Sequence, residues 1–174
     1  MGKNGIRTVK RTWNGVPKGE IMEIITLTST YEKWDTVAAF AENCSWRAGK
    51  ELARLMGENE FRDWERVFAA FEGGEPVGFC TLTEKDGLHP KYPYTPLIGF
   101  VFVDEAHRGK RISEKMIGKA LEYAKSIGYD KVYIMSGEKG LYEKYGFSPM
   151  GEYETIYGNY EQLSAIDLTE GKNG

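Results

Sequence analysis

The sequence predicts a mixed α/β domain of the α+β kind, with one central sheet. Of its 174 residues, 41% are hydrophobic, which is enough for a single sizeable core. Short apolar segments typical of strands alternate with segments of helical periodicity, and no internal repeat or linker divides the chain.

The first third of the chain predicts a strand followed by two helices. Residues 22–28 (MEIITLT) have the composition of a strand. Ser29 and Thr30 are helix-capping residue types and predict a helix over residues 31–40. Apolar residues recur there at helical spacing, at Trp34, Val37, Ala38 and Ala41. Residues 51–56 predict a second helix that ends at Gly57.

The middle of the chain predicts a hairpin and then a strand. Residues 67–71 and 77–82 flank Gly73-Gly74, a pair typical of a tight turn. Prolines interleaved with tyrosines predict a stiff loop over residues 90–96, and the apolar residues 98–103 predict a buried strand. A helix is expected over residues 113–127, capped by Gly128, and a strand over residues 131–136. A short helical turn at 141–145 ends at Gly146, and residues 153–157 and 162–168 form a hairpin around Gly158-Asn159.

Charge is distributed unevenly along the chain. The net charge is −3, but residues 1–20 carry +4 and the remainder −7, so a basic and flexible leader (1–20) is expected before a single domain at 21–170. The leader lacks the apolar run of a signal peptide, and no segment is long enough to span a bilayer. Cys44 and Cys80 are too few for a disulfide scaffold or a zinc cluster, so we expect a cytoplasmic protein without a metal.

Residues 103–113 (VDEAHRGKRIS) are the most informative segment. A buried strand runs into a basic turn that opens the helix at 113–127. The first N–H groups of a helix have no internal partner, and unpaired cations beside them oppose the helix dipole unless an anion docks there. Arg108, Lys110 and Arg111 therefore indicate a phosphate-bearing ligand, the alternative being a solvated basic helix start.

Two segments resemble motifs of the GNAT family of acetyl-CoA-dependent N-acetyltransferases, and the resemblance extends from about Met22 over most of the chain. Residues 103–113 resemble the family's pyrophosphate loop, Q/R-x-x-G-x-G/A, with Arg108 in the first position, and residues 140–147 (GLYEKYGF) resemble its Y-x-K-x-G-F segment. Arg111 and Ser113 depart from the pattern, since the family usually has Gly and then Gly or Ala. A Cβ at residue 111 costs little if that residue is already helical.

The resemblance implies the GNAT fold: a mixed, mostly antiparallel central sheet with helices on both faces and a splayed pair of parallel strands that holds coenzyme A. It implies a coenzyme site made by Val101, Val103, Arg108, Gly109, Lys110, Arg111, Ile112, Ser113 and Ser136. For Ser136, a contact with the coenzyme and a role as strand-end cap both stay open.

The resemblance also implies that Tyr142 protonates the departing coenzyme thiolate, the alternative being a tyrosine of the core, as Tyr145 is expected to be. No general base is assigned, because Leu97 stands where some members have a glutamate, and neither Glu105, His107 nor His89 has specific support. The acceptor cleft of the family corresponds to the region of Trp46, Arg47 and Phe61, with Tyr92 and Tyr94 on the opposite loop, the alternative for these aromatic residues being packing.

The expected function is transfer of an acetyl group from acetyl-CoA to a primary amine of a small molecule or peptide. Two alternatives are a non-catalytic acyl-CoA-binding regulatory module and an acetyltransferase directed at RNA or a ribosomal protein, for which the leader would be an electrostatic arm. The acidic body disfavours nucleic acid, no membrane partner is expected, and pairing into a homodimer through edge strands stays open.

Overall fold

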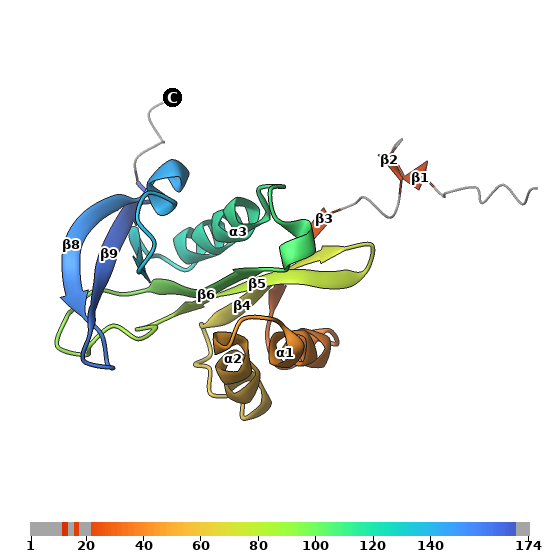
Figure 1. The fold of residues 1–174 in the computed structure, drawn as a ribbon, viewed down its shortest axis with the longest axis horizontal. Helices are drawn as coiled ribbons and strands as arrows, with labels where there is room; N and C mark the ends of the chain where they lie inside the picture. The colour runs from red at the N-terminus through yellow and green to blue at the C-terminus, as the bar shows by residue number, and fades with distance from the viewer. Residues whose placement is uncertain (1–11, 14–15, 18–21, 170–174) are drawn as a thin grey trace, which may run out of the picture.

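A computed structural model describes residues 12–13, 16–17 and 22–169. Its centre is a seven-stranded sheet of order β3-β4-β5-β6-β7-β9-β8 (Figure 1). The strands are β3 (Met22–Leu27), β4 (Arg66–Glu72), β5 (Glu75–Thr83), β6 (Leu97–Val103), β7 (Lys131–Ser136), β8 (Ser148–Glu154) and β9 (Tyr160–Asp167). Neighbouring strands are antiparallel except β6 and β7, so the predicted mixed, mostly antiparallel sheet is confirmed.

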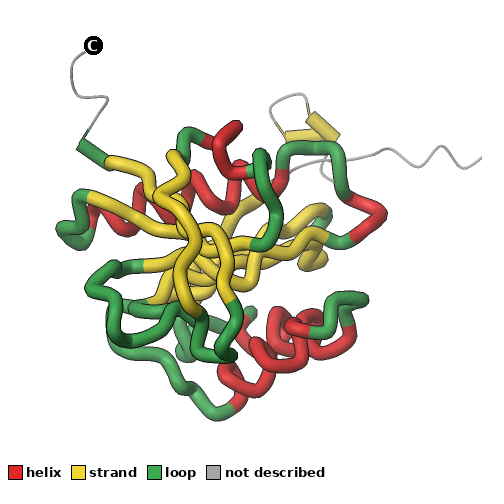
Figure 2. Tube along the Cα trace, turned by 60° about the vertical axis from the view of Figure 1, so that its left-hand side comes forward, coloured by secondary structure: helices red, strands yellow, loops and turns green. Residues whose placement is uncertain are grey.

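Helices cover both faces of this sheet, as expected (Figures 1 and 2). Helices α1 (Trp34–Asn43) and α2 (Ala48–Gly57) lie on one face and α3 (Ile112–Ser126) on the other. The 3₁₀ turns η2 (Glu105–His107) and η3 (Tyr142–Tyr145) precede α3 and β8.

Strand β4 shows why the central strands are apolar throughout. Val67 and Ala69 pack on the α1/α2 side, whereas Phe68 and Ala70 pack on the α3 side. Successive side chains of a strand point to opposite faces, and both faces of this strand are covered.

The parallel pair β6–β7 is short and then opens. Only Leu97–Tyr133 and Ile98–Ile134 are paired, although β6 continues to Val103 and β7 to Ser136. The splay that the resemblance implies is therefore present, and it leaves the second half of β6 without a strand on its β7 side.

The amino-terminal region is described in part. Strands β1 (Thr12–Trp13) and β2 (Val16–Pro17) form a separate antiparallel pair. The rest of the expected leader, residues 1–20, lies outside the described residues. Among the described residues, no helix is long and apolar enough to cross a membrane.

Three predicted element boundaries were wrong. Helix α1 begins at Trp34 without a side-chain cap, because residues 28–31 form a turn in which Tyr31 N–H donates to the Thr28 carbonyl (2.9 Å). Helix α2 begins at Ala48, three residues earlier than predicted. The last hairpin has its first strand at 148–154 rather than 153–157, because residues 155–159 form the turn, with Thr155 N–H donating to the Asn159 carbonyl (2.8 Å).

Candidate active site

A cleft of about 1220 Å³ opens where β6 and β7 diverge. It brings together the following sequence-predicted residues: Val101, Val103, Arg108, Gly109, Ser113, Ser136 and Tyr142. Of the other predicted coenzyme residues, Ile112 is buried in the core under α3, and Lys110 and Arg111 do not line the cleft.

The loop before α3 presents a row of free backbone donors. In the described part of the chain, the N–H groups of Gly109, Lys110 and Arg111 donate no hydrogen bond, and those of Ile112 and Ser113 belong to the first turn of α3. Gly109 (φ +86°) and Arg111 (φ +59°) both have left-handed backbone, an arrangement that turns successive N–H groups toward one side. This donor set fits the diphosphate of coenzyme A.

Arg111 differs from the expectation that residue 111 is already helical. It is the N-cap residue of α3 in left-handed conformation (φ +59°, ψ +29°), where a side chain costs about 1 kcal/mol relative to glycine. The glycine of the family motif thus has a conformational reason at this position, and Arg111 adopts the same backbone at a cost.

The three cations of the loop are not unpaired, contrary to the electrostatic argument from the sequence. Lys110 Nζ lies 3.3 Å from Glu72, and Arg111 Nε lies 2.7 Å from Glu114. Arg108 donates from Nε to the Val103 carbonyl (3.1 Å). What remains to attract an anion is the row of N–H groups together with Arg108, which lines the cleft.

Strand β6 carries a bulge at the mouth of the cleft. Phe79 pairs with Phe102 and Thr81 with Gly99, so one residue of β5 faces both Phe100 and Val101. Phe100 has φ +48°, which for an aromatic residue costs about 1–3 kcal/mol. The extra residue of a bulge is left unpaired, so the β5–β6 ladder is disrupted where β6 and β7 separate.

Tyr142 lines the cleft from η3, and within the described residues its hydroxyl has no hydrogen-bond partner. Burial raises the pKa of this phenol, and the nearby Glu138 raises it further, so the group keeps its proton. Tyr145, one turn later, shares a hydrogen bond of 2.8 Å with Ser113, which confirms its expected satisfied hydroxyl. Ser136 accepts a hydrogen bond from Glu138 N–H (2.9 Å), which supports the strand-end alternative.

Aromatic residues divide between the cleft and the core. Trp46 stacks on Phe102 (ring centroids 6.0 Å apart), and both Trp46 and Phe61 line the cleft. Tyr92 and Tyr94 instead pack with Tyr133 and Tyr153 in a separate apolar cluster and do not line the cleft, so their expected place opposite the acceptor is wrong and the packing alternative holds. Arg47 does not line the cleft either, and Leu97 is fully buried.

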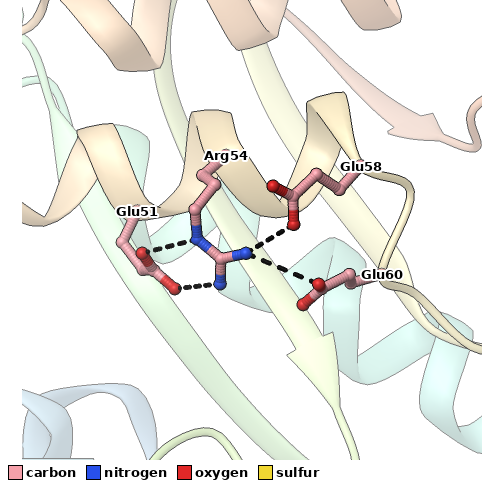
Figure 3. A network of polar contacts seen from close by, with 4 residues as sticks. All are labelled: Glu51, Arg54, Glu58 and Glu60. Carbon is pink, nitrogen blue, oxygen red and sulfur yellow. Dashed lines mark hydrogen bonds and ion pairs between the residues drawn. The ribbon is translucent and has the colours of Figure 1, made fainter.

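The α2/β4 wall of the cleft carries carboxylates that are all engaged. Arg54 binds Glu51 (2.6 Å), Glu58 (2.6 Å) and Glu60 (3.4 Å) at once (Figure 3). Glu65 accepts hydrogen bonds from two backbone N–H groups at 2.7 Å, those of residues 62 and 84.

Three other segments of the cleft lining, the 85–87 turn, the residues after β7 and strand β9, form an open wall with carboxylates that sequence analysis missed. Asp86, Glu138 and Glu161 line the cleft, and in the described part of the chain none has a side-chain hydrogen bond or ion pair. Burial raises the pKa of Asp86 to about 6, and the nearby charge of Glu161 adds to the rise. The Lys-Asp-Gly sequence at 85–87 has only the composition of a turn, so no local signal identifies Asp86.

Comparison with known proteins links this geometry to one family. Residues 26–147 match the model of the acetyltransferase (GNAT) family. No curated protein sequence matches the chain.

Several solved structures share the fold. A GNAT-family protein from Desulfovibrio desulfuricans is 11% identical, with 85% of this chain and 99% of that chain covered and a TM-score of 0.64. An aminoglycoside 6'-N-acetyltransferase in complex with coenzyme A is 15% identical (84% and 97% covered, TM-score 0.62). A spermidine N-acetyltransferase chimera with sequence from Vibrio cholerae is 16% identical (88% and 99% covered, TM-score 0.60).

Proposed function

The chain belongs to the GNAT family of acetyltransferases, and on that premise we propose that it transfers an acetyl group from acetyl-CoA to a primary amine by direct attack in a ternary complex. The observation that carries the proposal is the convergence, in one cleft, of Gly109 and Ser113 from the two ends of the N–H row, the bulged strand β6 and the Tyr142 phenol.

Each part of the cleft has a role in this reaction. The N–H row and Arg108 bind the coenzyme diphosphate, and the splayed edge of β6 at Val101 and Val103 pairs with the pantetheine arm. A free N–H of the β6 bulge stabilises the oxyanion of the tetrahedral intermediate.

Tyr142 then protonates the thiolate as the C–S bond breaks. Burial makes Tyr142 a weaker acid than a free phenol. In water the transfer from a phenol to a thiolate is slightly unfavourable, and the low-polarity surroundings of the cleft offset this because they also raise the proton affinity of the thiolate.

The acceptor is a small cationic amine. Asp86, Glu138 and Glu161 give the open wall negative charge, and among the described residues none of the three forms an ion pair. Two proteins of the same fold are described as an aminoglycoside and a spermidine acetyltransferase, and both of those acceptors carry several amines.

The test combines coenzyme binding with an acceptor panel. Calorimetry should show acetyl-CoA binding that weakens as salt rises, and Arg108→Glu should weaken it by at least about tenfold. Lys125→Glu, the same charge change on the last turn of α3, is the matched control. Acetyl-CoA is then mixed with polyamines, aminoglycosides, peptides with free amino groups and an RNA oligonucleotide, and thiol release and product mass are measured.

Thiol release with a small amine supports the proposal. Coenzyme binding without acetylation of any panel member would reject it in favour of an acyl-CoA-binding regulatory module. Acetylation of the RNA alone would also reject it.

A further inference from the structure

Asp86 is held at a fixed place in the cleft by the turn that contains it. Leu88 N–H donates to the Lys85 carbonyl (2.8 Å) across this turn, and Asp86 itself has φ +33°. Ile156 N–H, from the last hairpin, donates to the Gly87 carbonyl (2.9 Å). The turn is therefore anchored to a neighbouring element, and the position of its side chain does not depend on a free loop.

The Asp86 carboxyl lies directly against Gly99, the residue before the β6 bulge. A Cβ built on Gly99 would clash with all three atoms of this carboxyl group. The missing side chain at Gly99 thus creates the space that the carboxyl fills, beside the point where β6 and β7 separate.

A second buried polar group points to a ligand at the same place. Thr81 pairs with Gly99 across β5 and β6, and directly opposed residues of an antiparallel pair project to the same face. The Thr81 hydroxyl is fully buried, lines the cleft and has no hydrogen-bond partner in the described part of the chain. A polar group bound beside Asp86 would supply one.

The charges around Asp86 favour its protonation. The neighbouring Lys85 turns away and donates to the Tyr92 and Tyr94 carbonyls. Glu161 from β9 and Tyr142 from η3 interact with Asp86 electrostatically. With a pKa of about 6, Asp86 is mainly ionised at neutral pH and still a better proton acceptor than an ordinary carboxylate.

We infer that Asp86 accepts the proton that the acceptor ammonium group loses before its nitrogen attacks acetyl-CoA, an inference that rests on the proposed function. The N–H bond breaks, the proton moves to a carboxylate oxygen, and the freed nitrogen pair forms the C–N bond at the thioester carbon. The C–S bond then breaks and the thiolate takes the proton of Tyr142.

The remaining protons balance the reaction. After the attack, the nitrogen carries two protons. One stays on the amide, and the other passes through water to the Tyr142 phenolate and restores the neutral phenol. Asp86 releases its proton to solvent. The net change is ammonium plus thioester to amide, thiol and one proton.

The first experiment replaces Asp86 by Asn and uses the panel amine that the wild-type protein acetylates fastest. kcat/KM should fall by roughly 10²–10⁴-fold. The wild-type rate should rise with pH through about 6, and this limb should be absent in the variant. Coenzyme affinity should stay within about twofold, because Asp86 does not lie at the N–H row. Asp63→Asn, an exposed aspartate of the α2–β4 loop that does not line the cleft, is the matched control.

A second variant moves the carboxyl without removing it. Gly99→Ala should displace the Asp86 carboxyl and lower kcat/KM, and the double variant Gly99→Ala/Asp86→Asn should be no slower than Asp86→Asn alone. Infrared difference titration of the coenzyme-free protein gives a readout without activity. A carboxyl that titrates near pH 6 should be present in the wild type and in Asp63→Asn and absent in Asp86→Asn.

The outcomes separate this inference from the proposed function. A wild-type protein that acetylates no amine contradicts both. An active wild type with Asp86→Asn within about twofold of it, or with the acidic limb intact, overturns the role of Asp86 and leaves the acetyl transfer standing. Additive effects of the two substitutions would also overturn it.

Discussion

The two walls of the cleft carry the same kind of side chain in opposite electrostatic states. On the α2/β4 wall, Arg54 engages the carboxylates of Glu51 and Glu60 (Figure 3), and backbone N–H groups engage that of Glu65. On the open wall, Asp86 and Glu161 have no such partner among the described residues. The first wall uses its carboxylates for structure, and the second keeps them available for a ligand and its protons.

The largest expected effect is on the turnover of a variant at Tyr142, which lines the cleft near Glu138 and Asp86. Tyr142→Phe keeps the ring contact with Phe147 and removes only the hydroxyl, so turnover should fall by roughly 10²–10⁴-fold while coenzyme affinity changes little. Steady-state kinetics and calorimetry measure the two quantities. Tyr145→Phe, which loses the hydrogen bond to Ser113 instead, is the comparison variant. Unchanged turnover in Tyr142→Phe would make Tyr142 a packing residue.

A smaller effect concerns the stability cost of the unpaired Asp86. Its pKa is about 6 when folded against an ordinary 3.8, so folding binds its proton more tightly. Below pH 3.8 the protonated Asp86 carboxyl makes its full contribution to the free energy of unfolding. This contribution is lost as the pH rises through about 6. The full shift corresponds to about 3 kcal/mol, and partial exposure of the residue reduces it to about 1–2 kcal/mol.

Asp86→Asn should therefore raise the free energy of unfolding by about 1–2 kcal/mol at pH 7 and leave it unchanged below pH 4. Denaturant unfolding at the two pH values measures this. A variant that is less stable than the wild type at pH 7 would show that the carboxylate is paired after all.

The smallest effect tests the engaged wall. Arg54→Met removes the shared cation of Glu51, Glu58 and Glu60, which are all about half exposed. Exposed ion pairs contribute little and are screened by salt. Stability should fall slightly at low salt and recover at high salt, and kcat/KM should stay within about twofold. A change as large as that of Asp86→Asn would remove the distinction between the two walls.

The sequence predicted the fold, and it identified the residues around the splayed strands and the turn before α3 that line one part of the cleft, because both depend on local patterns. Buried apolar runs identify the central strands, and the strand, turn and helix at 98–127 are contiguous in the chain. The position of Tyr142 in the cleft agrees with the motif at 140–147, and its catalytic role stays a prediction.

The open wall, where we propose that the acceptor binds, could not be predicted in the same way. Asp86 depends on three separate segments: its own turn, Gly99 on β6 and the hairpin that anchors the turn. Tyr92 and Tyr94 were misassigned because a tyrosine that packs and one that binds a ligand look alike in sequence. The ion pair of Lys110 also escaped prediction, since Glu72 lies far from Lys110 in the chain, whereas the pair of Arg111 with Glu114, three residues on, was a local signal that was overlooked.

The short contact between β6 and β7 has a mechanical consequence. Within the described sheet, only two residue pairs connect strands β3–β6 to strands β7–β9. The sheet therefore consists of two parts, which we call panels, joined at Leu97 and Ile98. Under a pulling force or in mild denaturant, the joint should yield before either panel does, because each panel is held by longer antiparallel ladders. A ligand that pairs with the free part of β6 should therefore stiffen this joint.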